Sequence, residues 1–234
     1  VWSFATGDIF VSSPALSPDG STVYVGSYDK SLYAVDATTG KKVWSFATGG
    51  GVESSPALSH DGSTVYVGSD DKSLYAVDAT TGKAAWSFPM QTSVTFSPAL
   101  SLDGSMVYIS EFEKQNGGLY AVNSTTGKAV WTFTCPGLCR LESSPALSPD
   151  GLTIYVGSDL GLYALDAMTG KVLWSFDTTN LYVYSKPTLS PDGSIVFFGG
   201  RLGGLYAVDT TTRKAVWSFA VEVAYDERSR PALS

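Results

Sequence analysis

Near-identical repeats of 42 to 45 residues, each holding several stretches typical of short β-strands, predict an all-β chain folded as a β-propeller. Each repeat is marked by a tryptophan, and successive tryptophans are 42, 42, 45, 43 and 43 residues apart. The copy that starts at Pro14 reads PALSPDGSTVYVGSYDKSLYAVDATTGKKVWSF, and the copy from Pro56 repeats it with few changes. We therefore expect each copy to form one blade of four antiparallel strands. The tryptophans are Trp2, Trp44, Trp86, Trp131, Trp174 and Trp217.

The first half of each repeat predicts two strands joined by a tight turn. In the first copy, residues 12–17 (SSPALS) form a short strand, and Asp19-Gly20 follows as a hairpin signal because glycine adopts positive φ at little cost. The Asp-Gly pair recurs in all five copies. Residues 22–27 are rich in β-branched and aromatic side chains and predict the second strand.

The second half of each repeat predicts two more strands. Residues 31–36 (SLYAVD) are apolar on both faces, as expected of a strand that lies between two layers. The turn Ala37-Thr38-Thr39-Gly40-Lys41 then reverses the chain into an outermost strand over residues 42–46. Its tryptophan is large enough to bridge the gap where adjacent blades splay apart at the rim.

We expect one propeller domain over residues 1–234 that does not close on itself. Residues 1–4 read as an outer strand and residues 230–234 as an inner strand, each without the rest of its blade. Unpaired edges favour a longer propeller of which this chain is an excerpt, or edges completed by a partner. The five complete blades are expected at residues 13–46, 55–88, 97–133, 144–176 and 186–219.

Composition removes several classes of function. The chain is 44% hydrophobic and 13% aromatic but only 16% charged, so it can bury a large core. A net charge of −7 without a Lys/Arg cluster argues against binding nucleic acid, because a phosphate backbone needs a basic footprint. No apolar run reaches the length of a membrane span, and no signal-peptide pattern opens the sequence, so membrane insertion is not expected.

The run Leu-Tyr-Ala-Val-Asp-Ala-x-Thr-Gly-Lys-x-x-Trp, at residues 32–44 and 74–86, closely resembles the PQQ-like, or quinoprotein-type, β-propeller repeat. The resemblance covers essentially the whole chain and implies tryptophan docking, in which the indole of one blade packs on the Ala and Gly region of the next. Thr212-Arg213 replaces Thr-Gly in the last copy, which puts docking there in doubt. The docking set implied is Trp44, Trp86, Trp131, Trp174 and Trp217.

Candidate site residues lie where the copies disagree. The Asp-Gly and Thr-Gly-Lys turns share one face and are nearly identical, which suits a structural role, whereas the connections of the opposite face vary and are the expected ligand side. These candidates are Glu111, Phe112, Glu113, Lys114, Arg140, Tyr182, Tyr184, Arg201, Asp226 and Arg228.

Each candidate has a structural alternative. The carboxylates could gather a cation or be solvated loop charges, and the arginines could receive an anion or be rim charges. Tyr182 and Tyr184 could form a sugar or peptide platform or pack a strand edge. His60, the only histidine, stands in an Asp-Gly hairpin, a poor place for a catalytic triad. We predict no catalytic residue and no metal site.

Cys135 and Cys139 flank a Pro-Gly turn that has no counterpart in the other copies. The turn can fold the two sulfurs toward one another, so a disulfide and free thiols are both open. Pairing would favour an extracytoplasmic or secreted location, because disulfides persist in oxidising compartments. Zinc is not expected from two thiols without a nearby histidine.

Two classes of function follow. The near-uniform repeats and the lack of an acid, base or metal cluster favour a non-catalytic propeller that binds proteins or serves as a scaffold, similar to the bacterial outer-membrane assembly propeller. The alternatives are a small-ligand or sugar-binding propeller and part of a quinoprotein dehydrogenase. The resemblance implies that such enzymes hold PQQ beside calcium with a carboxylate and an amide, a set that does not map onto this sequence. No cofactor is expected for the scaffold.

Overall fold

The computed structural model describes residues 1–112, 118–137, 139–178, 182–200 and 204–220. The described part of the chain is all-β and contains no helix, so it offers no helix that could span a membrane. Its contacts group the chain into two compact units. The first unit is residues 1–107 with 122–130, and the second is residues 108–121 with 131–234.

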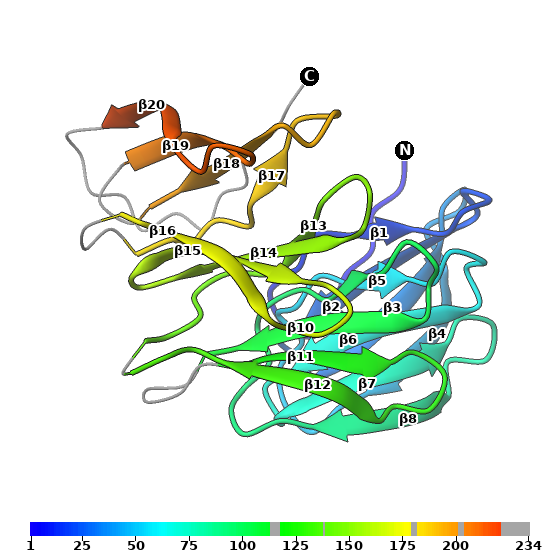
Figure 1. The fold of residues 1–234 in the computed structure, drawn as a ribbon. Coiled ribbons are helices and arrows are strands. Elements are labelled where there is room, and N and C mark those ends of the chain that lie inside the picture. Colours follow the sequence, from blue (N-terminus) through cyan, green and yellow to red (C-terminus); the bar gives the residue numbers. More distant parts are fainter. Residues whose placement is uncertain (113–117, 138, 179–181, 201–203, 221–234) are drawn as a thin grey trace. The chain divides into compact units, whose positions relative to one another are not determined.

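The described strands form five four-stranded antiparallel sheets, as predicted (Figure 1). In each sheet the strands pair in the order of the sequence, so each sheet is one repeat and one blade. The first strands are β1 (Ala15–Leu16), β5 (Ala57–Leu58), β9 (Ala99–Leu100), β13 (Ala146–Leu147) and β17 (Thr188–Leu189). The second strands are β2 (Thr22–Ser27), β6 (Thr64–Ser69), β10 (Met106–Glu111), β14 (Thr153–Ser158) and β18 (Ile195–Gly199).

The third strands are β3 (Ser31–Asp36), β7 (Ser73–Asp78), β11 (Gly118–Asn123), β15 (Gly161–Asp166) and β19 (Gly204–Asp209). The fourth strands are β4 (Lys42–Ala47), β8 (Ala84–Pro89), β12 (Ala129–Thr134), β16 (Val172–Asp177) and β20 (Ala215–Ala220). The register sets Trp44, Trp86, Trp174 and Trp217 each opposite an alanine. In the first blade Ala34 pairs with Trp44, and a bulge then shifts Val35 to pair with Lys42. The same bulge follows Ala76, Ala164 and Ala207.

The core lies between neighbouring sheets. In the first unit, Tyr24 and Trp44 of the first blade form one buried cluster with Val65 and Val77 of the second. An equivalent cluster in the second unit joins Tyr155 and residues of the fourth blade to Phe198 and residues of the fifth. The strands predicted to be apolar on both faces are therefore the ones that lie between two layers.

Two expectations about strand extent are wrong. The first strand covers only residues 15–16, because the side chain of Ser12 takes the place of a ladder bond: Gly26 N donates to Ser12 Oγ at 2.8 Å, and Ser12 Oγ donates to Gly26 O at 3.1 Å. Residues 1–4 form no strand. Trp2 and Phe4 nevertheless pack as a fourth strand would, with the indole nitrogen of Trp2 donating to Ala37 O and the Phe4 ring meeting Tyr33 edge-on. Residues 230–234 lie outside the described part.

The strand ends define two sides of each blade. On what we call the turn side, the Asp-Gly turn bonds to the Thr-Gly-Lys turn of its own blade, as in the 2.8 Å bond from Ala37 N to Ser21 O. On what we call the loop side, the connection between blades bonds to the connection between the second and third strands. Examples are Asp70 N to Gly51 O at 2.9 Å and Asp159 N to Arg140 O at 3.1 Å.

Candidate functional site

Glu111 ends β10 and is completely buried on the loop side of the second unit. It occupies the position held by Ser27, Ser69 and Ser158 in other blades. Its Oε1 accepts a 2.6 Å hydrogen bond from the hydroxyl of Tyr120 on β11. Because a buried carboxylate needs such donors, Glu111 is held as a fixed part of the blade rather than as a solvated loop charge.

Arg140 and Phe112 come together on the loop side of the second unit. The guanidinium carbon of Arg140 lies 5.9 Å from the centroid of the Phe112 ring, within the range of a cation–π contact. The backbone of Arg140 is fixed by its bond to Asp159 Oδ1 at 2.9 Å, while its buried Nε has no hydrogen-bond partner in the described part of the chain. Phe112 keeps 36% of its surface exposed, so a cation and an aromatic ring are presented together.

Tyr182 and Tyr184 lie side by side, with ring centroids 6.1 Å apart and planes inclined by 35°. Both are half-buried, and Val183 between them is fully buried. Buried Val183 thus anchors the segment, while the two tyrosine rings stay partly exposed. Both interpretations are open: a platform for a sugar or peptide, and packing of a strand edge. The other candidates, Glu113, Lys114, Arg201, Asp226 and Arg228, lie outside the described residues.

Cys135 and Cys139 are joined by a disulfide, with their Cα atoms 5.4 Å apart. Both side chains are buried. The bridge ends one residue before Arg140, so it restrains the connection that carries this arginine.

Sequence reasoning missed an acidic group on the loop side of the first unit. Asp70 lies near Glu53 and Asp71, and burial together with these two charges raises the pKa of its carboxyl. Glu53 Oε1 accepts a 2.5 Å bond from the Tyr28 hydroxyl. The recurrence of Glu at residues 53 and 142, in matching positions of two blades, is the sequence signal that could have indicated this group.

A second loop-side arrangement is repeated and structural. Asp29 Oδ2 accepts from Gly7 N at 2.8 Å and from the Tyr33 hydroxyl at 2.7 Å. Asp71 makes the same pair of contacts with Gly49 N and Tyr75. Each of these carboxylates ties a connection between blades to the neighbouring sheet.

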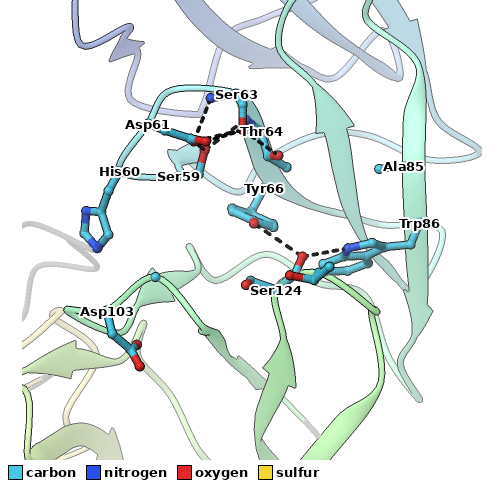
Figure 2. A pocket seen from close by; sticks show the side chains of 12 residues that line it. Ser59, His60, Asp61, Ser63, Thr64, Tyr66, Ala85, Trp86, Asp103 and Ser124 are labelled. Carbon is cyan, nitrogen blue, oxygen red and sulfur yellow. Dashed lines mark hydrogen bonds between the residues drawn. The ribbon is translucent and has the colours of Figure 1, made fainter.

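A pocket of about 470 Å³ opens on the turn side of the first unit, between the second and third blades (Figure 2). Tyr66 and Trp86 form its inner wall, and both direct their polar atoms to Ser124 O, at 3.5 and 2.9 Å. His60 stands at its edge, where Nε2 lies 2.9 Å from Ser101 O. The full lining is Ser59, His60, Asp61, Ser63, Thr64, Tyr66, Ala85, Trp86, Asp103, Gly104, Ser124 and Thr125.

The two carboxyls of the pocket, Asp61 and Asp103, have pKa values below the usual value for aspartate. Hydrogen bonds from Ser59 and Ser63 lower the pKa of Asp61 from 3.8 to about 2. Bonds from Ser101 and Ser105 do the same for Asp103. The pocket therefore carries two negative charges at any pH well above 2.

Tryptophan docking joins consecutive blades within each unit. The indole nitrogens of Trp44 and Trp86 donate to Ala79 O and Ser124 O at 2.9 Å, and Trp131 donates to Ala167 O at 3.1 Å. The indole lies so close to the turn glycine that a Cβ on Gly82 would come within 2.7 Å of Trp44 Cδ2.

The fifth blade departs from this pattern. Arg213 occupies the glycine position at φ 61°. In the other four blades a Cβ at this position would meet the docked indole within 3 Å. Trp174 is as buried as Trp44 but, within the described residues, donates no matching bond to the turn at Thr210. Trp217, the last of the set, is 43% exposed.

Among the described residues, no three His, Cys, Asp or Glu side chains are grouped so as to hold a metal ion.

Comparison with known protein families shows to which family this chain belongs. The family model described as "Outer membrane protein assembly factor BamB" matches residues 1–131 and 88–230, which together cover nearly the whole chain. The chain belongs to this BamB family. Among curated proteins, no sequence matches it.

Solved structures show the same propeller fold. BamB from Moraxella catarrhalis aligns with a TM-score of 0.73 and 22% identity over 91% of this chain and 62% of that one. Quinohemoprotein alcohol dehydrogenase ADHIIG from Pseudomonas putida HK5 aligns with a TM-score of 0.76 and 20% identity, over 90% of this chain and 42% of that one.

The quinohemoprotein alcohol dehydrogenase of Comamonas testosteroni aligns with a TM-score of 0.80 and 18% identity, over 98% of this chain and 47% of that one. This chain thus spans between 42% and 62% of the length of these three structures. At these identities the likeness concerns the fold.

Proposed function

We propose that this propeller is a non-catalytic scaffold that binds proteins within a larger assembly outside the cytoplasm. The observation that carries the proposal is the match of residues 1–230 to a family described as an outer membrane protein assembly factor. The Cys135–Cys139 disulfide supports an oxidising compartment. Fold likeness by itself would not choose between a scaffold and an enzyme.

The loop side is the binding surface we favour. It carries irregular connections, whereas the turn side is built from repeated Asp-Gly and Thr-Gly-Lys turns. Phe112 and Arg140 are the described residues best suited to contact a partner, since aromatic and arginine side chains dominate the energetics of protein interfaces. The cation–π contact and the fixed backbone of Arg140 pre-organise both side chains, which lowers the entropy lost on binding.

Photo-crosslinking from defined positions in the source cells tests this proposal. A benzophenone amino acid replaces Phe112 or Leu160 on the loop side, and Leu152 or Met168 serves as the matched turn-side control; all four are exposed positions in the second unit. We expect one discrete crosslinked product from the loop-side positions, weakened by Arg140→Ala, and none from the controls. Products confined to the turn side, or no discrete product from any position, would contradict the proposal.

A quinoprotein dehydrogenase is the second candidate, because two quinohemoprotein alcohol dehydrogenases share this fold, with TM-scores of 0.76 and 0.80. Its test is reduction of an electron-acceptor dye by the chain supplied with PQQ, calcium and an alcohol. Turnover that depends on all three additions would establish the enzyme.

A further inference from the structure

In each of the first three blades, a tyrosine of the third strand donates its hydroxyl to a carboxylate of the same blade. The pairs and their distances are Tyr33 to Asp29 at 2.7 Å, Tyr75 to Asp71 at 2.8 Å and Tyr120 to Glu111 at 2.6 Å. Tyr163 holds this position in the fourth blade, but its hydroxyl has no hydrogen-bond partner in the described part of the chain. The fourth blade therefore keeps the donor without its carboxylate.

The carboxylate is missing because the connection between the second and third strands is shorter in the fourth blade. Three residues separate the paired Ser27 and Ser31 in the first blade, whereas two separate the paired Ser158 and Gly161. The shorter connection depends on Gly161, whose φ is 137° and where a Cβ would clash with Phe176 O. The space beside the tyrosine is therefore not filled by a side chain at this position.

The second donor of the arrangement is missing as well. Asp71 also accepts a 2.7 Å bond from the backbone nitrogen of Gly49, in the connection from the preceding blade. Pro136 holds the position of Gly49 in the connection before the fourth blade, and proline has no N–H to donate. The Tyr163 ring nevertheless packs on Phe133 at 5.5 Å between centroids, against 5.3 and 5.2 Å for the equivalent pairs of the first and second blades. The ring is thus held as in those blades while its hydroxyl is left without a partner.

A pocket of about 160 Å³ lies at this connection, on the loop side of the second unit. Tyr163, Ser175 and Asp177 line it together with Leu160 and Gly161. The register pairs Gly161 with Asp177 and Tyr163 with Ser175, so these four residues share one face of β15 and β16. Since a cavity of about 150 Å³ can hold a molecule as large as benzene, a group of side-chain size fits this pocket.

The charges near the hydroxyl restrict the group that it can bind. Asp177 lies opposite Gly161, where the first and second blades have an uncharged residue. Burial, followed by the charges of Asp159 and Asp177, raises the pKa of Tyr163, so the phenol stays a neutral donor at physiological pH. A carboxylate in the pocket would be repelled by these charges, and Pro136 offers it no N–H. A neutral carbonyl oxygen accepts from the hydroxyl without that repulsion.

We propose that this pocket binds a primary amide, whose oxygen accepts from the Tyr163 hydroxyl and whose N–H groups donate to Asp177. A carboxylate has about four lone-pair sites, so Asp177 can accept from an amide in addition to its contacts within the chain. The source of the amide is an asparagine or glutamine side chain of a partner protein, because the pocket lies on the loop side. This source, but not the binding of the amide itself, rests on the proposed function.

Titration of the ¹⁵N-labelled chain with acetamide tests the site, with the backbone amide signals of Leu160, Gly161 and Asp177 as the readout. Sodium acetate has the same shape but a negative charge, and methylammonium chloride supplies a cation without a carbonyl oxygen. We expect a saturable shift with acetamide alone. No shift with acetamide, or an equal saturable shift with acetate or with methylammonium, would overturn the proposal.

Tyr163→Phe removes the hydroxyl without removing any described hydrogen bond, so the unfolding midpoint should stay unchanged. We expect its affinity for acetamide to fall by about fivefold or more, as the loss of one hydrogen bond requires. Tyr75→Phe is the matched control at the same position of the second blade and should leave acetamide affinity unchanged. Full affinity in Tyr163→Phe would refute the role of the hydroxyl.

A loop graft from the second blade is the second test. Residues 159–161 are replaced by Asp-Asp-Lys-Ser, the sequence of residues 70–73, which restores both the loop length and the carboxylate. We expect the new carboxylate to accept from Tyr163 and acetamide binding to be lost, while circular dichroism verifies that the fold is retained. Undiminished binding in the graft would show that the site is not the space left by the shorter connection.

Photo-crosslinking from position 112 identifies the source of the amide. Tyr163→Phe is added to the chain that carries the benzophenone amino acid in place of Phe112. We expect a weaker crosslinked product than in the chain with Tyr163 intact. A product of undiminished strength would refute a partner protein as the source. Absence of any product even with Tyr163 intact would instead contradict the proposed protein-binding function, and acetamide binding would still decide the site.

Discussion

The indole nitrogen of Trp44 donates a 2.9 Å hydrogen bond to the carbonyl oxygen of Ala79, across the boundary between the first and second blades. Trp174 has the same burial, 9% exposed, but faces a turn in which Arg213 replaces glycine and makes no such bond among the described residues. Comparing variants of these two tryptophans therefore separates the contribution of the indole hydrogen bond to stability from the contribution of indole packing.

Trp44→Phe should lower the free energy of unfolding by about 1 kcal/mol more than Trp174→Phe. Both changes reduce a ring of equal burial, but only the first leaves a carbonyl oxygen without its donor. Chemical denaturation of both variants measures the difference. Equal losses would show that the indole N–H contributes nothing to docking.

Arg213→Gly should stabilise the chain by about 1 kcal/mol, because a non-glycine residue at φ 61° is strained. It should also allow Trp174 to dock, so the gain should exceed that of Lys30→Gly, which relieves a similar φ of 70° where no indole docks. Unfolding midpoints of both variants provide the comparison. A gain no larger than that of Lys30→Gly would argue that Trp174 is kept out by something other than the arginine Cβ.

Gly82→Ala should destabilise the chain by about 2 kcal/mol or more. The new Cβ would be at φ 66° and would also meet Trp44 Cδ2 at 2.7 Å. Gly20→Ala is the matched control, since it has φ 73° but no atom within 4 Å of its Cβ, and should show the backbone strain alone. Similar losses in the two variants would mean that the indole moves aside freely.

Much of this fold is predictable because the sequence repeats the same strand-and-turn pattern in five consecutive copies. The bounds 22–27 and 31–36 agree with β2 and β3, since turn residues flank both strands. The first strand is shorter than predicted because Ser12 bonds through its side chain, a choice that strand propensity does not encode.

The sites were less predictable. The loop-side residues were recognisable by their departure from the repeat, but the contact between Arg140 and Phe112 depends on the packing of two connections. The turn-side pocket was missed because His60, Ala85 and Ser124 each look like an isolated change along the chain. Only the packing of the second blade against the following turn gathers them.

Stability should fall as the pH is lowered from about 4 to about 2. The carboxyls of Asp19, Asp61, Asp103 and Asp192 have pKa values lowered from 3.8 to about 2 in the folded chain, chiefly by hydrogen bonds from serine hydroxyls. A lowered pKa stabilises the folded state above the unfolded value, and this stabilisation is lost as the pH falls through the folded value.

The acid dependence is measured by unfolding at successive pH values. Ser17→Ala removes the bond that contributes most to the low pKa of Asp19 and should make the slope shallower. A variant slope identical to that of the unmodified chain would show that the serine does not set this carboxyl's pKa.

The most direct test of the scaffold account is native mass spectrometry of the chain titrated with PQQ in the presence of calcium ions. Because the scaffold account assigns no cofactor to this chain, it predicts that the chain keeps its own mass of 24.7 kDa without retained PQQ or calcium. A stable complex of one PQQ and one calcium ion per chain would contradict it and would restore the dehydrogenase interpretation.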